Sequence, residues 1–277
     1  MHGLGNDFIV VDLRALPDVD LSAEEVQRLC DRRLGIGADG VLSILPTSAA
    51  GSAAFARLRI QNADGSEAEM CGNGLRCVAR YLAEQDKLAA NTVAVETGAG
   101  VLSCQLTRAV PETTIESICI AMGAPRFPAE SLRRPLRLDA ASEPLWITEI
   151  SMGNPHAVMF FEGDSDLLTL AGRFGPQLER HPWFPNRTNV EFARRRSDGE
   201  FDLVVWERGC GITRACGTGA CATAVAATRL GLAESHRFLG LHLPGGRLEV
   251  CVDSDENQVY LRGPAVTVYS GEVFVDA

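Results

Sequence analysis

The chain has 277 residues, of which 46% are hydrophobic and 22% charged, so it can bury a full core and is long enough for two domains. Its formal net charge of -10 argues against nucleic acid or an anionic membrane as the main partner, because phosphate-binding surfaces carry clustered positive charge. No stretch approaches the ~20 apolar residues that span a bilayer, and the N-terminus lacks the features of a signal peptide, so we expect a cytoplasmic protein.

The first helix signal is a capping box at Ser22 and Glu25, just ahead of a short apolar pattern. Residues 35–40, which come next, fit the dinucleotide-binding pattern G-x-G-x-x-G. That pattern needs a strand before it and a helix after it, whereas this segment follows a helix and precedes the strand-like residues 41–45. We therefore expect no nucleotide site there.

A second helix is predicted directly after Cys71, where the sequence reads Cys-Gly-Asn-Gly. Its apolar residues recur at helical spacing on one face: Leu75, Val78, Ala79 and Leu82. We expect that face to be buried, and the arginines Arg76 and Arg80 to reach polar surroundings.

The second half of the chain contains short apolar runs typical of strands, such as residues 201–206 and 248–252. The one dense basic run, residues 194–196, is followed by Ser-Asp-Gly, which is typical of a solvated hairpin. After Cys216 comes a helix that is small or apolar on every side and stops near Gly231. A helix of that kind is a buried one, which here predicts that strands enclose it.

The chain contains an internal repeat. Cys71 and Cys216 lie 145 residues apart in the similar sequences Met-Cys-Gly-Asn-Gly and Ala-Cys-Gly-Thr-Gly. Other pieces recur in the same order: residues 5–8 with 153–156, and residues 97–102 with 244–248. Three pairs of similar segments in the same order predict two halves that share one fold.

Each of the two repeated cysteines begins a helix and is followed by small residues. Such a sulfur lies beside unpaired backbone N–H groups and the positive end of the helix dipole. We expect this setting to lower the thiol pKa from about 8.5 by one or more units, so that the thiolate can serve as a base. The same N–H groups can bind a carboxylate and the charge that develops when its α-carbon loses a proton. They belong to Gly72, Asn73 and Gly74 in the first half and to Gly217, Thr218 and Gly219 in the second.

Inversion at an α-carbon without a cofactor needs a base on one face and an acid on the other. Two coupled thiols meet this need, since ionising one raises the pKa of its partner. Metal ligation, a redox disulfide and plain packing are the competing interpretations. The spacings to Cys77 and Cys221 do not match C-x-x-C pairs, so we expect no metal site, and we interpret those two as packing residues. We expect all nine cysteines to be free thiols.

Lysine is almost missing from the chain. Lys87 is the only one, and it lies in a polar stretch. Pyridoxal phosphate is attached to its enzymes through a lysine Schiff base. The sequence therefore argues against a pyridoxal-dependent racemase, and we expect no cofactor.

Several polar residues beside apolar runs are candidates for holding an amino acid: Asn62, Asn154, Asn189 and the adjacent Glu207 and Arg208. A Glu-Arg pair can bind both ends of a zwitterion. Such pairs are usually surface ion pairs, however, and asparagine before Pro or Asp-Gly usually marks a turn. Each of these residues taken alone is therefore a poor indicator of a site.

Taken together, these residues resemble the diaminopimelate epimerase family. The segment 62–76 resembles the family signature around its first cysteine. Further blocks match in order: residues 2–8, 151–156, 206–209 and 215–220. The resemblance covers nearly the whole chain.

The resemblance implies an α+β fold of two pseudo-symmetric lobes, each a mainly antiparallel β-barrel around a central helix, in agreement with the repeat. We expect residues 1–115 with 262–277 to form the N-terminal lobe and residues 116–261 the C-terminal lobe. The resemblance also implies a cofactor-independent isomerase that interconverts LL- and meso-diaminopimelate in lysine and peptidoglycan precursor biosynthesis. It further implies that the enzyme is a homodimer.

By the same resemblance, Cys71 and Cys216 would be the two acid/base residues. The backbone N–H groups of Gly72, Asn73, Gly217 and Thr218 would hold the carboxylate at the reacting centre. The resemblance implies further substrate contacts from Asn6, Asn62, Asn154, Asn189, Glu207 and Arg208. His156 and Glu207 would tune the pKa values of the thiols.

Other functions stay open on the residues alone. A proline or hydroxyproline racemase would use the same two thiols, but its substrate lacks the second amino acid end that Glu207 and Arg208 would bind. A non-catalytic amino acid binder or a thiol redox sensor is the alternative from another class. We hypothesise that oxidation joins Cys71 to Cys216 and inactivates the enzyme, because two sulfurs that share one α-carbon lie close together.

Overall fold

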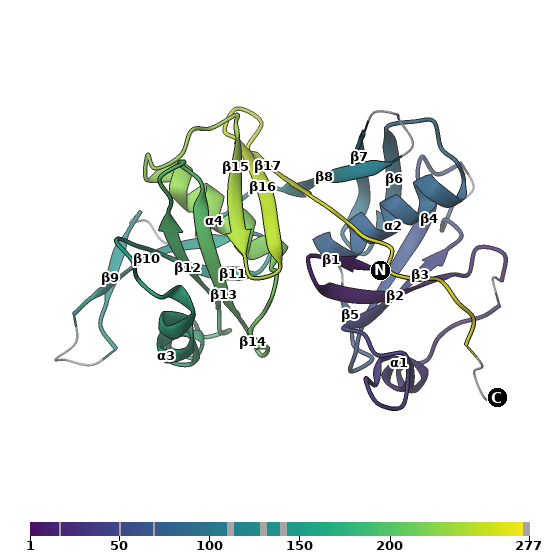
Figure 1. Cartoon of the computed structure of the whole chain (residues 1–277), viewed down its shortest axis with the longest axis horizontal. Coiled ribbons are helices and arrows are strands. Elements are labelled where there is room, and N and C mark those ends of the chain that lie inside the picture. Colours follow the sequence, from purple (N-terminus) through teal and green to yellow (C-terminus); the bar gives the residue numbers. More distant parts are fainter. Residues whose placement is uncertain are drawn as a thin grey trace. The chain divides into compact units, whose positions relative to one another are not determined.

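The computed structural model describes residues 1–16, 18–49, 51–68, 70–109, 114–127, 132–138 and 143–273. The chain forms two compact units: Met1–Ile120 with Gly263–Ala277, called unit 1 here, and Ala121–Arg262, called unit 2. Each unit combines a mainly antiparallel set of strands with helices, which confirms the predicted α+β class (Figure 1). The lobe boundaries 1–115 with 262–277 and 116–261 stay a prediction.

In unit 1 the strands curve around helix α2, and helix α1 lies outside them (Figure 1). The elements are β1 (His2–Gly3), β2 (Asn6–Asp12), α1 (Ala23–Cys30), β3 (Gly40–Leu45), β4 (Ala56–Asn62), β5 (Glu67–Ala68), α2 (Gly72–Gln85), β6 (Thr92–Thr97), β7 (Gly100–Arg108) and β8 (Ile115–Gly123). Parallel pairing joins β2 to β3 and β4 to β6. The pairs β1–β2, β3–β4, β4–β5, β6–β7 and β7–β8 are antiparallel.

Unit 2 has the same plan around helix α4. Its elements are β9 (Arg134–Leu136), β10 (Leu145–Ser151), β11 (Pro155–Phe161), α3 (Leu167–Glu179), β12 (Asn189–Arg195), β13 (Phe201–Glu207), β14 (Gly211–Ile212), α4 (Gly217–Arg229), β15 (Phe238–Leu243), β16 (Gly246–Asp253) and β17 (Gln258–Gly263). The parallel pairs are β11–β12 and β13–β15, and the pairs β10–β11, β12–β13, β15–β16 and β16–β17 are antiparallel.

The internal repeat is confirmed by the order and the direction of these strand pairs. From β2 to β7 the pattern of parallel and antiparallel neighbours matches that from β11 to β16. The helix at the centre comes at the same place in each series, after β5 in unit 1 and after β14 in unit 2. Two halves with weak sequence similarity therefore share one fold, as the three pairs of similar segments predicted.

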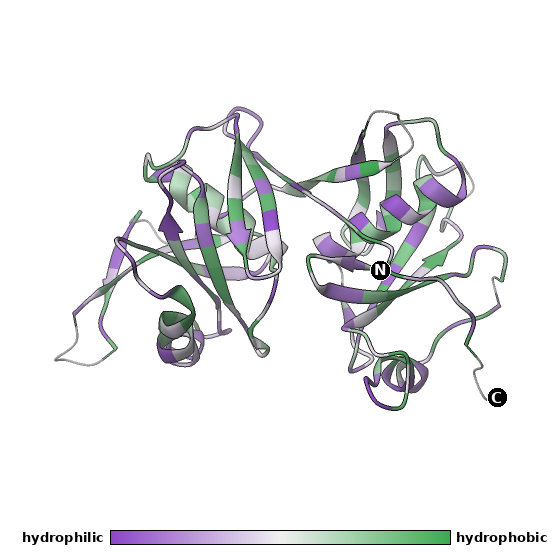
Figure 2. Cartoon of the chain, viewed as in Figure 1, coloured by the Kyte–Doolittle hydropathy of each residue, from purple (hydrophilic) through white to green (hydrophobic). Residues whose placement is uncertain are grey.

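The central helices differ in how much charge they bury. Helix α4 is enclosed on all sides, and its residues from Gly219 to Ala227 are buried, as its composition predicted. Helix α2 is more polar (Figure 2). Its predicted apolar face is buried, but Arg76 is also fully buried. The prediction of a single buried face was therefore too narrow, although Arg76 does reach polar partners, as expected.

The ends of the helices follow the local sequence where a strong cap exists. Helix α1 begins after Ser22, and the predicted capping box with Glu25 is complete. Helix α3 was not predicted from the sequence. Its start is capped by Asp166, whose carboxylate accepts bonds from the N–H groups of Leu168 and Thr169. An acidic cap ahead of apolar residues at helical spacing was the signal that the prediction overlooked.

The basic run at residues 194–196 lies at the turn between β12 and β13, which confirms the predicted hairpin. Two of its three charges are paired within the hairpin, because Arg194 and Arg196 both donate to Asp202. Among the helices in the described part of the chain, none has the length and apolar character needed to cross a membrane.

Candidate active site

Cys71 is the N-cap of helix α2. Its backbone is extended, with φ -142° and ψ 109°, so the chain turns into the helix at the next residue. The sulfur accepts a hydrogen bond from the N–H of Gly74 at 3.4 Å. The N–H groups of Gly72 and Asn73, at the first helical positions, have no acceptor within the helix and can bind an anion.

Cys216 holds the same position in helix α4. Its φ of -123° and ψ of 111° match those of Cys71 closely, and its sulfur accepts from the N–H of Gly219 at 3.4 Å. Gly217 and Thr218 then provide the first helical N–H groups. The predicted placement of both cysteines at helix starts is confirmed.

The surroundings of the Cys216 sulfur do not lower its pKa. Burial raises the pKa of this thiol well above its ordinary value, and the carboxylates of Glu207 and Glu191 raise it further. Hydrogen bonds from Thr218 and from the N–H of Gly219 lower it, but by less. The prediction of a lowered pKa at the helix start is therefore wrong for Cys216. Burial destabilises the thiolate by more than these hydrogen-bond donors stabilise it.

Around Cys71, the predicted residues Asn6 and Asn73 are joined. Asn73 donates from Nδ2 to Oδ1 of Asn6 at 3.1 Å, and Asn6 donates to Asp39 at 2.8 Å. The buried guanidinium of Arg76 donates to Oδ1 of Asn73 at 2.7 Å. Cys71, Asn73, Asn6 and Arg76 are called the Cys71 cluster below, and in it a buried cation fixes the amide that follows the cysteine.

Asn62 lies at the end of β4, and its amide donates to Oγ of Ser66 at 3.0 Å. It is opposite Gly40 in the β3–β4 pair, while Gly40 is opposite Phe8 in the β2–β3 pair. Asn62 is exposed and belongs to a turn, which is the ordinary role of Asn before Ala-Asp-Gly. The hydrogen bonds described for it do not connect it to Cys71.

Around Cys216, a chain of polar side chains leads into the core. Asn154 donates from Nδ2 to Oγ1 of Thr218 at 3.3 Å, and Thr218 lies 3.6 Å from the Cys216 sulfur. Asn154 Oδ1 is 2.9 Å from Nε2 of His156, whose Nδ1 is 2.6 Å from Oε1 of Glu191. These five residues are called the Cys216 cluster below. The predicted residues Asn154, His156 and Thr218 are thus connected to the cysteine.

Asn189 and Arg208 are linked through the backbone. Oδ1 of Asn189 accepts from the N–H of Arg208 at 2.9 Å, and its Nδ2 donates to the carbonyl of Pro155 at 3.1 Å. The carboxylate of Glu207 accepts from the hydroxyl of Thr213. Arg208 donates from its guanidinium to the carbonyl of Asn186 at 3.1 Å. Both residues of the pair thus have hydrogen bonds to groups outside the pair, to Thr213 for Glu207 and to Asn189 and Asn186 for Arg208.

Two buried carboxylates near these residues were missed by the sequence reasoning. Glu191 lies inside the apolar run Val190 to Phe192, and an acidic residue within a strand buried on both faces was the available signal. Glu179, at the end of α3, accepts from Nε1 of Trp206 at 2.8 Å and from the N–H of Gly209 at 3.1 Å. It thereby holds both ends of the segment that carries Glu207 and Arg208.

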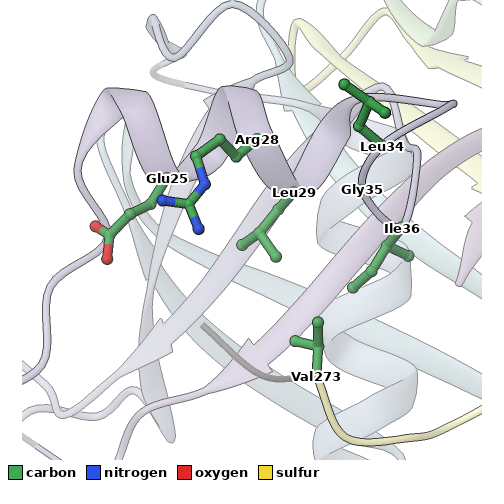
Figure 3. A pocket seen from close by; sticks show the side chains of 7 residues that line it. All are labelled: Glu25, Arg28, Leu29, Leu34, Gly35, Ile36 and Val273. Carbon is green, nitrogen blue, oxygen red and sulfur yellow. The ribbon is translucent and has the colours of Figure 1, made fainter. Parts of the chain in front are cut away.

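Two other features do not include the predicted site residues. Within the described ranges, one group of side chains has the spacing of a metal site, His236, Asp253 and Asp255, but it is mostly exposed. A surface pocket lies beside helix α1 (Figure 3). It is lined by Glu25, Arg28, Leu29, Leu34, Gly35, Ile36 and Val273. Lys87, the only lysine, is exposed after helix α2.

Comparison with known proteins gives one consistent result. The family model described as "Diaminopimelate epimerase" matches residues 1–128 and 148–268. The diaminopimelate epimerase of Desulfitobacterium hafniense is 43% identical over 290 residues, with 100% of this chain and 98% of that protein covered. The one from Synechocystis is 42% identical over 281 residues, with 98% and 96% covered.

Solved structures with lower sequence identity share the fold. A probable proline racemase from Agrobacterium radiobacter has a TM-score of 0.72 at 18% identity, with 99% of this chain and 92% of that chain covered. A hydroxyproline epimerase from Agrobacterium vitis, with bound trans-4-hydroxy-L-proline, has a TM-score of 0.64 at 16% identity, with 95% and 87% covered.

Proposed function

The chain belongs to the diaminopimelate epimerase family, and on that premise we propose that Cys71 and Cys216 are the two acid/base residues of its reaction. The enzyme is an isomerase that converts LL-diaminopimelate to meso-diaminopimelate in lysine biosynthesis. The observation that carries the mechanism is the matched N-cap position of the two cysteines at the starts of equivalent helices.

The proposed reaction moves two protons and changes no oxidation state. One cysteine, as thiolate, takes the proton from the α-carbon, so that a C–H bond breaks and an S–H bond forms. The other cysteine, as thiol, gives its proton to the opposite face of the same carbon. The charge that develops on the substrate carboxylate meets the N–H groups at the helix starts, where the dipole favours an anion.

Further residues, beyond the two cysteines, are proposed to hold the substrate. Backbone N–H groups of Gly72, Asn73, Gly217 and Thr218 bind the carboxylate at the reacting centre. Side chains of Asn6, Asn62, Asn154 and Asn189 and the pair Glu207 and Arg208 contact the remaining polar groups, several of them at the distal centre. Fixing both ends of the substrate is what would distinguish diaminopimelate from a simple α-amino acid.

We propose that the reaction needs no cofactor. The only lysine is exposed and lies in a left-handed turn with φ 49°, away from both cysteines in the sequence, so it does not provide a buried Schiff base. His156 and Glu207 are proposed to tune the thiols, and the carboxylate of Glu207 does contribute to raising the pKa of Cys216. A cytoplasmic location and a homodimer complete the proposal.

Deuterium exchange tests this function directly. The reduced protein is incubated with LL-diaminopimelate in D2O, and deuterium entry at the α-position is followed by NMR, with L-proline and trans-4-hydroxy-L-proline in parallel samples. We expect deuterium at one α-carbon of diaminopimelate together with the meso product.

The alternatives give different results in the same experiment. Exchange with a proline alone would keep the two-thiol chemistry and replace the substrate. No exchange with any of the three compounds, in a protein shown to be folded and reduced, would contradict an acid/base role for the cysteines and favour a binder or a redox sensor.

A further inference from the structure

The two cysteine clusters differ at equivalent positions of the repeat. In unit 2, His156 on β11 and Glu191 on β12 are fully buried behind the start of α4. In the parallel strand pairs, Phe8 is opposite Gly40 in unit 1, and His156 is opposite Asn189 in unit 2. Phe8 is therefore the equivalent of His156. Two residues further along the second strand of each pair, Leu42 is the equivalent of Glu191. An ionisable pair in one unit therefore replaces an apolar pair in the other.

Contacts at the helix starts support this correspondence. A Cβ on Gly219 would lie 3.0 Å from Oε1 of Glu191 and 3.3 Å from the Cys216 sulfur. A Cβ on Gly74 would lie 2.9 Å from Cδ2 of Leu42. Glu191 and Leu42 thus contact the third residue of equivalent helices, where a glycine gives them room. The carboxyl group of Glu191 is held against the turn that carries the cysteine.

The donors and acceptors of the Cys216 cluster follow one another in a single consistent order. Asn154 donates its amide N–H to Thr218, so its oxygen accepts the Nε2–H of His156. The Thr218 hydroxyl, already an acceptor, is then left to donate to the Cys216 sulfur, 3.6 Å away. This order requires a proton on Nε2 of His156. The Nδ1 atom of His156 lies 2.6 Å from Oε1 of Glu191, so these two atoms share one further proton.

We propose that Glu191 is a positioning residue of the Cys216 cluster, holding the His156 ring so that Asn154 and Thr218 present a hydroxyl donor to the Cys216 sulfur. The proposal rests on the proposed function in assigning a role to Cys216. It makes the two half-reactions chemically unequal, since Cys216 has a proton-sharing pair behind it and the equivalent places behind Cys71 are filled by Phe8 and Leu42.

Loss of the shared proton has a defined effect on the chain of bonds. If His156 keeps its remaining proton on Nδ1, its Nε2 becomes an acceptor, the Asn154 amide turns, and Thr218 then donates to Asn154 instead of to the sulfur. The carboxylate of Glu191 also becomes an uncompensated negative charge beside Cys216, where it adds to that of Glu207. Both changes disfavour the thiolate form of Cys216.

The groups that face this cluster come from every element around it. Toward Glu191 lie His156 and the backbone N–H of Ala157 on β11, and the carboxylate of Glu207 on β13. Toward Cys216 lie both carboxylates, the Thr218 hydroxyl and the Gly219 N–H. Oε2 of Glu191 has no hydrogen-bond partner among the described residues. A buried carboxylate oxygen without a donor is costly, which indicates that Glu191 is kept for its effect on its neighbours.

The test compares Glu191→Gln with the wild type by peptide-resolved mass spectrometry of iodoacetamide alkylation over a range of pH, without substrate. Glutamine keeps the shape and a bond to His156 but cannot become negative. We expect the midpoint pH for alkylation of Cys216 to fall by about one unit, with that of Cys71 unchanged. We also expect the limb of the kcat–pH profile that reports ionisation of Cys216 to shift to lower pH, while KM changes little.

Matched variants make the test specific. Glu249→Gln removes another partly buried carboxylate of unit 2, on β16, that pairs with Arg262 and Arg247, and it should leave both alkylation profiles unchanged. The double variant H156F/E191L copies the apolar pair of unit 1, and it leaves neither position with a buried polar group that lacks its partner. It should give Cys216 a simple single-ionisation profile.

Two results would overturn the proposal. One is a Cys216 profile in Glu191→Gln that coincides with that of the wild type. The other is an equal change at Cys71 and Cys216, which would show general loosening. Because alkylation needs no substrate, the role of Glu191 is tested even if the wild type does not epimerise diaminopimelate, and that separate failure would appear in the D2O experiment.

Discussion

At the scale of single residues, the two cysteines occupy positions that helix stability does not explain. N-caps are usually Ser, Thr, Asp or Asn, because an oxygen accepts well from the helix N–H groups. Sulfur is a weaker acceptor, yet both Cys71 and Cys216 cap their helices at 3.4 Å. The proposed acid/base role of the two thiols would explain why both units have a less effective cap.

Replacing either cysteine by serine should abolish epimerisation while keeping the fold. Cys71→Ser and Cys216→Ser retain an N-cap acceptor, but the hydroxyl pKa is too high for proton transfer, so we expect kcat to fall by about a thousandfold or more. Turnover of LL-diaminopimelate and circular dichroism measure the two effects. Cys251→Ser, on β16, is the control. Near-normal turnover by either active-site variant would rule out the two-base mechanism.

At the scale of elements, one carboxylate ties together three strands of unit 2. Glu200, just before β13, lies 2.5 Å from Nε2 of His242 on β15 and 2.6 Å from Nη2 of Arg247 on β16. A Cβ on Gly240 would overlap this carboxylate, so the glycine lets Glu200 lie directly over β15. The parallel β13–β15 pair is short, and Glu200 adds charged bonds at its end.

Glu200 should make the stability of the protein depend on pH. The bond to Arg247 and the proximity of His242 lower the pKa of Glu200 to about 2 in the folded state, from an ordinary 4.5. A lowered pKa gives stability that is fully present above pH 4.5 and is lost as the pH falls toward 2. We expect Glu200→Gln to lower the free energy of unfolding by about 2 kcal/mol at pH 7.

Urea unfolding at pH 7, 5 and 3.5 measures this effect of Glu200. The difference between wild type and Glu200→Gln should stay constant from pH 7 to 5 and shrink at pH 3.5. Glu234→Gln, which removes an exposed partner of Arg237, should differ little from the wild type at any pH. A Glu200→Gln difference that does not change with pH would contradict the assigned pKa.

At the scale of the whole molecule, the chain begins in unit 1, forms unit 2 and returns. The returning segment is held in unit 1 by buried and half-buried arginines. Arg76 donates to the carbonyl of Pro264 at 3.2 Å, and Arg80 to that of Ala265 at 2.6 Å. The N–H of His2 donates to the carbonyl of Val266 at 2.9 Å. Unit 1 is therefore completed only after unit 2 has been made.

Oxidation should inactivate the protein by joining a thiol of each unit. The proposed mechanism requires both sulfurs to reach one α-carbon, so we expect a mild oxidant to form a disulfide between Cys71 and Cys216. Peptide mapping should show the linked peptides, turnover should fall in proportion, and dithiothreitol should restore it. The variant Cys71→Ser should form no such link. Full activity with the disulfide complete would contradict the acid/base assignment.

Local patterns in the sequence were sufficient for the repeat, the capped helix α1 and the two cysteines at helix starts, because periodicity and capping act between residues that are close along the chain. The burial of Arg76 and the pair of His156 with Glu191 were decided by the tertiary structure, whereas helix α3 had a local signal, the Asp166 cap, that the prediction overlooked. Glu191 lies 35 positions from His156, and whether it is desolvated depends on strands and a helix that converge only in the fold. The same long-range burial reversed the pKa direction that the helix start alone predicted for Cys216.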